Sequence, residues 1–377
     1  MQLRGKYTMD EYKFVGKQIV DTSMVLMGQS GSGKTVIIHN VLKALHGISE
    51  QIVVFSPTAD SNKAYEGFVP RPLIHTDLST KRVKGKGNTG LLQILDDVVQ
   101  RQKAFTDVYR TVNKLENLQA LYQKYTDKAC GRVIKQLSIC RSRTRQSIES
   151  TYADNNSKRV KLLKEVDERF NNLLSEVFKK AIKIKGKEIK KDLSKLTDMD
   201  RLVFANVDFN PRLVIVFDDC AAELKPHFSH EIFRVLLYQG RHYFVTSIFT
   251  CQSDTDMPVN LRQNAFITIL TSPVSAYGYF RKDTNKMASK SDRQDTKIPI
   301  LDCIDEIFRI SYRKLVYVRD DSIRNCSGFF FLQCDIVEPF MFTSDSITEI
   351  CRRAEGDASE WNSDNPFYNK FRNQMKK

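Results

Sequence analysis

The sequence contains no apolar run long enough to cross a membrane, although 41% of its 377 residues are hydrophobic. A membrane-spanning helix needs about 20 consecutive apolar residues. The first stretch, MQLRGKYTMDEYKF, also lacks the apolar centre of a secretory signal. We therefore expect no membrane span and no secretory route.

Cysteine pairs with metal-ligand spacing are also missing. The eight cysteines are scattered and never form a C-x-x-C pair, with which structural zinc sites usually begin. His227 and His230 have no further ligands near them in the sequence. This pattern predicts free thiols in a reducing compartment and no structural metal.

Proline is absent from Leu73 to Asn210, and only two glycines occur between Leu91 and Asp200. Apolar residues recur there at intervals of three and four, as in VKLLKEVDERFNNLLSEVFKKAI, which predicts long helices. The polar run TYADNNSKR is the expected turn between two helical arms. Residues 101–200 carry 24 lysines and arginines against 13 aspartates and glutamates. The excess predicts a polyanionic partner, with nucleic acid first, or else a solvated lysine-rich face.

The chain is longer than one typical domain, and sheet-like sequence surrounds the helical block on both sides. We expect residues 1–97 and 206–345 to form one core and residues 98–205 to be a basic helical insertion. Residues 346–377 are expected to be a polar, poorly ordered tail. Its aromatic residues are a candidate docking motif: Trp361, Phe367, Tyr368 and Phe371.

Continuous apolar segments mark the strands of the expected core. SMVLMG, QIVVFSPT, LVIVFDDC, YFVTSIFTCQ and NAFITILTS each have the pattern of a strand buried on both faces of a parallel sheet. TVIIHNVLKAL, between the first two, has helical spacing and ends at a glycine. KLVYVRD and GFFFLQCDIV predict two late strands, for which a hairpin is one arrangement.

The segment GQSGSGKT matches the motif G-x-x-x-x-G-K-[ST] without a mismatch. Small residues let successive backbone N–H groups point at a phosphate, and the following helix adds its positive end. Lys34 is expected to reach the β- and γ-phosphates, and the Thr35 hydroxyl to bind Mg²⁺. The motif predicts a nucleoside-triphosphate site made by Gly28, Gln29, Ser30, Gly31, Ser32, Gly33, Lys34 and Thr35.

Two carboxylates follow the apolar strand LVIVFDDC. Asp218 is expected to be the Mg²⁺-associated carboxylate of the nucleoside-triphosphate site. Asp219 stands where many ATPases have a glutamate that polarises the attacking water, and it is one methylene shorter. The alternative is that Asp219 caps the helix that follows it.

Polar residues flank the next strand at both ends. Gln252 ends YFVTSIFTCQ, with Thr250 on the same face, and is expected beside the γ-phosphate rather than serving only as a turn residue. Arg241 precedes this strand and so lies at the opposite end of the sheet from its own nucleotide. It is predicted to act on a neighbouring subunit's site, or else to be a cation at a helix end. Arg262 is the second candidate for this role.

GQSGSGKT, IVVFSPTAD, LVIVFDDC and GRHYFVTSIFTCQSDTDMPVNLRQNAF together resemble the genome-packaging ATPases of large double-stranded DNA viruses, in the poxvirus-type branch of the HerA/FtsK superfamily. The likeness covers residues 20–75 and 205–275. Its most specific part runs from Gln252 to Asn264, because the first motifs are common to many ATPases.

The resemblance implies an α/β fold of the additional-strand, RecA-like P-loop NTPase class, with a mainly parallel sheet. It further implies a homo-oligomeric ring that uses ATP and Mg²⁺ to move double-stranded DNA into a capsid. Lys34, Asp219 and Gln252 would then act in cis and Arg241 in trans. Capsid or portal proteins are candidate partners, and the expected location is the host cytoplasm at the assembly site, or the virion.

Two other functions remain open at this point. One is a cytosolic cellular DNA translocase or helicase of the same superfamily, and the other is a nucleotide-gated scaffold that does not hydrolyse ATP. The insertion likewise has three possible roles: a grip on DNA, a docking arm, or an oligomerisation strut. Its most basic segments are RSRTRQ, residues 141–146, and KKAIKIKGKEIKK, residues 179–191.

Overall fold

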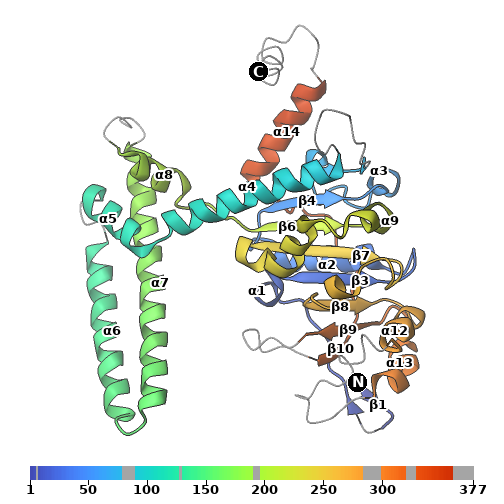
Figure 1. Cartoon of the computed structure of the whole chain (residues 1–377). Helices are drawn as coiled ribbons and strands as arrows, with labels where there is room; N and C mark the ends of the chain where they lie inside the picture. The colour runs from blue at the N-terminus through green and yellow to red at the C-terminus, as the bar shows by residue number, and fades with distance from the viewer. Residues whose placement is uncertain are drawn as a thin grey trace. The chain divides into compact units, whose positions relative to one another are not determined.

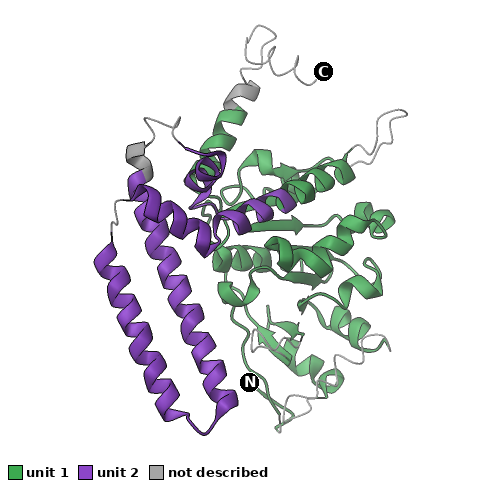
Figure 2. Cartoon of the chain, turned by 60° about the vertical axis from the view of Figure 1, so that its left-hand side comes forward, with its two compact units in different colours: residues 1–102, 211–377 green, residues 103–210 purple. Residues whose placement is uncertain are grey.

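The computed structural model describes residues 1–5, 7–78, 90–126, 130–189, 196–282, 299–319 and 328–359. The chain divides into two compact units, which Figure 2 shows in different colours. Unit 1 comprises Met1–Gln102 and Pro211–Lys377, and unit 2 comprises Lys103–Asn210. The docking motif expected in the tail lies outside the described residues.

Unit 1 is built on an eight-stranded sheet with the order β10-β9-β8-β3-β7-β6-β4-β5 (Figure 1). All neighbouring strands are parallel except at β9, which runs antiparallel to both β8 and β10. The strands are β3 Ser23–Met27, β4 Gln51–Phe55, β5 Ile74–His75, β6 Leu213–Phe217, β7 Val245–Cys251, β8 Ile267–Leu270, β9 Lys314–Val318 and β10 Gly328–Leu332. A separate small sheet pairs β1 Gln2–Leu3 with β2 Tyr7–Thr8.

This strand order confirms the predicted fold class. β7 lies between β3, which leads into the glycine-rich loop, and β6, which leads into the paired aspartates. An extra strand between these two is what the additional-strand class of P-loop NTPases requires. The two late strands that the sequence predicted form the antiparallel pair of β9 and β10.

Each central strand is buried on both faces, which explains the continuous apolar runs in the sequence. Alternate residues of β6 enter two different cores: Ile215 and Phe217 lie in one, and Val214 and Val216 in the other. In the first core the rings of Phe55, Phe217 and Phe249 stack, with centroids 5.2 and 4.5 Å apart. This stack ties β4, β6 and β7 together close to their carboxyl ends.

Helices cover both faces of the sheet. α2 packs on one core through Ile37, Ile38 and Val41, and α12 and α13 pack on the other. The helices of unit 1 are α1 Gly16–Ile19, α2 Lys34–Leu45, α3 Ala59–Asn62, α9 Ala221–Leu224, α10 Glu231–Arg234, α11 Val259–Arg262, α12 Pro273–Phe280, α13 Ile300–Phe308 and α14 Asp345–Ser359. α14 corrects the expectation of a poorly ordered tail as far as Ser359, because its apolar residues recur at helical spacing and Cys351 is buried.

Unit 2 is helical, with α5 Leu115–Tyr125, α6 Gly131–Thr151, α7 Asn156–Ile189 and α8 Asp198–Asn206. Its core is a small cluster in which the rings of Tyr122 and Phe178 lie 4.7 Å apart. α6 and α7 form an antiparallel pair, and the segment between them contains the turn that the sequence predicted.

The observed boundaries of unit 2 differ from the expected insertion, residues 98–205, by a few residues at each end. α4, Leu91–Val112, is continuous, and its first half carries Leu91, Leu95 and Val98 into the core of unit 1. At the other end, Val207 packs in the core of unit 2. Both shifts arise because side-chain packing, rather than a change in helical pattern, sets the boundary.

Candidate nucleotide site

The glycine-rich loop connects β3 to α2 and has the backbone that its sequence predicts. Gly31 and Gly33 have φ values of +73° and +87°, a region that favours glycine. A Cβ atom at Gly28 would lie 1.7 Å from Thr271 Oγ1, so no larger residue fits there without movement. The loop is therefore a tight backbone turn that ends where α2 begins.

Lys34 is the first residue of α2 and is 7% exposed. Its ammonium group donates to the carbonyls of Gly28 at 2.7 Å and Gln29 at 3.0 Å. Burial lowers the pKa of Lys34, and the nearby Asp219 and Asp218 act in the opposite direction. The cation thus lies within the loop, held by neutral carbonyl groups and facing two carboxylates.

Asp218 follows β6 directly and is 4% exposed. Its Oδ2 accepts a hydrogen bond from the Tyr65 hydroxyl at 2.8 Å, and its Oδ1 accepts one from Thr250 Oγ1 at 3.1 Å. Burial raises the pKa of Asp218, while the bonds from Tyr65 and Thr250 lower it. Protein donors therefore fix both oxygens of this buried carboxylate in place.

Asp219 is turned differently from Asp218 because its φ is +54°. Its N–H donates to Thr250 Oγ1 at 2.8 Å, and its Oδ1 accepts from Gln252 Nε2 at 3.2 Å. The N-cap position of α9 is Cys220, without a side-chain cap bond. The alternative role of Asp219 as a helix cap has no support in this geometry, whereas its pairing with Gln252 joins two predicted site residues.

A pocket of about 270 Å³ brings the predicted residues together. It opens between the glycine-rich loop and the ends of β4 and β6. Most of its lining comes from residues that the sequence singled out, and Thr58 and Asn62 come from the segment after β4. The lining residues are Ser30, Gly31, Gly33, Lys34, Thr35, Val36, Thr58, Asn62, Asp218 and Asp219.

Tyr65 is the main residue of this site that the sequence did not reveal. It is 1% exposed, in the segment after α3, and its hydroxyl reaches Asp218 across 153 positions of the chain. The only local signal is an aromatic residue after the strand QIVVF, which is common in any core. Thr250, in contrast, was expected on the face of Gln252 and is found bridging both aspartates.

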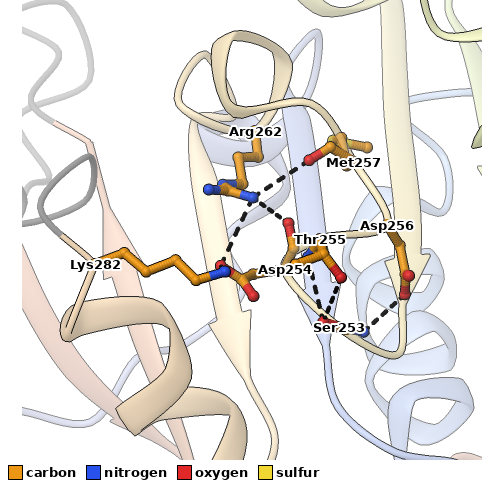
Figure 3. Close-up of polar contacts among 7 residues, drawn as sticks. All are labelled: Ser253, Asp254, Thr255, Asp256, Met257, Arg262 and Lys282. Atoms are coloured by element: carbon orange, nitrogen blue, oxygen red, sulfur yellow. Dashed lines mark hydrogen bonds and ion pairs between the residues drawn. The ribbon is translucent and has the colours of Figure 1, made fainter.

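Arg262 is held by contacts within its own chain, as Figure 3 shows. It is 3% exposed, donates to the carbonyls of Asp254 and Met257, and forms an ion pair with Asp254. Lys282 also contacts Asp254, at 2.6 Å. These contacts brace the loop after β7, and they make Arg262 unsuitable for reaching a neighbouring subunit.

Arg241 has the opposite character. It is exposed and lies in a 3₁₀ turn, Gly240–Tyr243, just before β7. Since β7 is parallel to β3 and β6, this turn is at the amino edge of the sheet, whereas the pocket is at the carboxyl edge. Arg241 therefore does not belong to the site of its own chain, and its action in trans stays a prediction.

The described residues were also compared with the requirements of a metal site and of a membrane-spanning helix. Among the described residues, no group of three or more His, Cys, Asp or Glu side chains is placed to hold a metal ion. Thr35 and Asp218, which both line the pocket, are the candidates for Mg²⁺. None of the described helices combines the length and hydropathy that crossing a membrane requires.

Solved structures with a similar arrangement include two nucleotide-bound proteins. One is the genome packaging NTPase B204 of Sulfolobus turreted icosahedral virus 2 with ATP-gammaS, at 13% identity and a TM-score of 0.34, covering 84% of this chain and 98% of that one. The other is the plasmid coupling protein TrwB with ADPNP, at 12% identity and 0.35, covering 90% and 92%. These TM-scores are too low to assign a fold or a function. The fold is identified from the strand order and the glycine-rich loop.

Sequence comparison finds viral relatives, while no protein-family model matches the chain. The uncharacterized protein B354L of African swine fever virus is 33% identical in a Kenyan isolate over 363 residues, which are 96% of each chain. A Namibian isolate gives 32% over the same length. Protein 015R of Frog virus 3 is 30% identical over 108 residues, 25% of this chain and 34% of that one. The chain therefore belongs to the family of the B354L proteins of African swine fever virus.

Proposed function

We propose that this chain is an ATPase that moves double-stranded DNA, working as a ring of identical copies that packages a viral genome. The observation that carries the proposal is the arrangement at the carboxyl edge of the sheet. There the glycine-rich loop, Lys34, Asp218 and Asp219 line one pocket, and Gln252 bonds to Asp219 at its side. The viral origin of its relatives supports packaging over a cellular role.

The pocket residues fit a nucleoside triphosphate and its metal ion. Among the described residues, the hydrogen bonds of Lys34 go to two neutral carbonyls. Exchanging these carbonyls for charged phosphate oxygens would give the ammonium stronger hydrogen bonds. Thr35 and Asp218 would hold Mg²⁺, which when bound neutralises charge on the β- and γ-phosphates. Asp218 is already oriented for this by Tyr65 and Thr250.

Asp219 and Gln252 are placed to handle the attacking water. The Gln252 amide donates to Asp219 Oδ1, which leaves the second carboxylate oxygen available to accept a proton or a hydrogen bond. The left-handed backbone of Asp219 is an uncommon conformation for a non-glycine residue, of the kind found at functional sites. We infer that Gln252 reports the state of the phosphate to the segment after β7.

Steady-state hydrolysis separates the motor from the scaffold. Wild-type protein should hydrolyse ATP, with stimulation by duplex DNA, and Lys34→Ala should lower turnover by about 100-fold or more because it removes a cation from the reacting phosphates. Lys43→Ala is the matched control, since Lys43 is an exposed lysine of the same helix. Turnover that ignores both DNA and the Lys34 substitution would contradict the proposal and favour the scaffold.

Unit 2 is our candidate for the part that binds DNA. Some of its cations that the sequence suggested for this role instead bond to a carboxylate within the unit. Within RSRTRQ, Arg141 and Arg145 both bond to Asp167 of α7, and Arg141 lies over the Phe170 ring. These two arginines hold the helical pair together. Exposed cations of α6, such as Arg132, Lys135 and Arg143, remain available for phosphates.

Replacing Arg132, Lys135 and Arg143 together by glutamine should weaken duplex DNA binding. Each lost phosphate contact should reduce the slope of log affinity against log salt by about 1. The control is Glu149→Gln with Glu165→Gln, at exposed positions of α6 and α7, and it should not weaken binding. If the triple variant kept the affinity and the salt slope of the wild type, unit 2 would not bind DNA through these cations. A docking arm or an oligomerisation strut would then be its remaining roles.

Subunit mixing tests the role of Arg241. Arg241→Ala and Lys34→Ala should each be inactive alone, because each ring interface then lacks one essential cation. A 1:1 mixture should regain up to about a quarter of wild-type turnover, since random assembly pairs an intact loop with an intact arginine at that fraction of interfaces. The measurement is ATP turnover at constant total protein, and no recovery at any ratio would count against action in trans.

Tyr65→Phe tests the orientation of Asp218. Removing the hydroxyl frees one carboxylate oxygen, so apparent Mg²⁺ affinity in the ATPase assay should fall by about 10-fold, the lower range for such supporting residues. Binding of nucleotide without metal should not change. Tyr238→Phe is the control, because its hydroxyl bonds to the Asn260 carbonyl away from the pocket. Equal Mg²⁺ dependence in the two variants would show that Tyr65 does not orient the metal ligand.

A further inference from the structure

A second lysine contacts the glycine-rich loop from outside the pocket. Lys314 is the first residue of β9. Because β9 runs antiparallel to β8, its start lies at the carboxyl edge of the sheet, where the loop is. The half-buried Lys314 ammonium donates to the carbonyl of Ser32 at 2.8 Å and to that of Thr271 at 3.2 Å.

The bond to Ser32 has a direct consequence for the neighbouring peptide group. In a trans peptide the carbonyl of Ser32 and the N–H of Gly33 point in opposite directions, and the structure contains no cis peptide bond among its described residues. Lys314 draws the Ser32 carbonyl outward. The Gly33 N–H, at the start of α2, therefore points away from Lys314.

Ser32 is held at a second point by Thr271, which follows β8. Thr271 Oγ1 lies 2.7 Å from Ser32 Oγ and donates to the Met27 carbonyl at 3.0 Å. The same hydroxyl is the atom that a Cβ at Gly28 would strike. Thr271 therefore links Ser32 to the end of β3, and Lys314 holds the carbonyl of the Ser32–Gly33 peptide.

The charge of Lys314 has no carboxylate to balance it among the described residues, where its polar partners are the two carbonyls. Burial lowers the pKa of Lys314, so placing a cation here has an energetic cost. A Cβ at Gly33 would lie 3.8 Å from Lys314 Nζ, so the charge is next to the loop itself. An unbalanced cation at this place is complementary to a polyphosphate.

We propose that Lys314 is a positioning residue of the phosphate loop, which orients the Ser32–Gly33 peptide and adds a fixed positive charge behind it. The proposal rests on the nucleotide binding proposed above. Lys34 and Lys314 then have separate tasks. Lys34 lies inside the loop and can exchange its carbonyl partners for phosphate oxygens, whereas Lys314 keeps its carbonyl partners throughout.

The test is the affinity of the full chain for the non-hydrolysable analogue ADPNP and for ADP, measured by calorimetry. Lys314→Met should weaken ADPNP binding by about 10- to 100-fold, in the range of a lost charged hydrogen bond, and should weaken ADP binding less, since ADP carries less charge. Lys314→Arg keeps the positive charge, so it should retain more ADPNP affinity than Lys314→Met does. Lys43→Met is the control and should bind as wild type does.

If Lys314 only stabilised the fold, Lys314→Met would lower the melting temperature of the free protein and leave the nucleotide affinity of the folded protein unchanged. That result would overturn the proposal. If Lys314→Met does not fold, Lys314→Gln replaces it, because glutamine keeps a hydrogen-bond donor without the charge. The same loss of ADPNP affinity is then expected. Equal losses for ADPNP and ADP also overturn it. Wild-type protein that binds neither nucleotide would instead overturn the proposed function, so the two failures are distinguishable.

Discussion

The hydroxyl of Thr250 is the contact on which the candidate site depends. It donates to Asp218 and accepts from the N–H of Asp219, and so joins the end of β6 to the end of β7. This bridge keeps Asp218 buried against Tyr65 and turns Asp219 toward Gln252. Because β7 lies between β6 and β3, Thr250 stands on the strand that separates the two carboxylates from the glycine-rich loop.

The central strands and the loop could be predicted because their signals are local. A strand buried on both faces is a continuous apolar run, and a loop with positive φ values is rich in glycine. Tyr65 and Lys314 could not be found in this way. Tyr65 meets Asp218 across 153 positions and Lys314 meets Ser32 across 282, and nothing in the spacing of a single sequence marks such contacts.

Unit 2 shows the same division between local and tertiary information. Helical periodicity and the excess of lysine and arginine predicted basic helices, and these are present. The sequence could not show that Asp167 engages Arg141 and Arg145, because that choice depends on how α6 and α7 pack. The unit boundaries moved for a related reason: α4 is one continuous helix whose two halves belong to different cores.

The central claim is that hydrolysis at this pocket moves double-stranded DNA. Displacement of a third strand from a DNA triplex, followed over time on a long duplex, measures that movement directly. We expect displacement that requires hydrolysable ATP and that stops with ADPNP or with the Lys34→Ala variant. ATP hydrolysis by an oligomeric protein that never displaces the third strand would contradict the account.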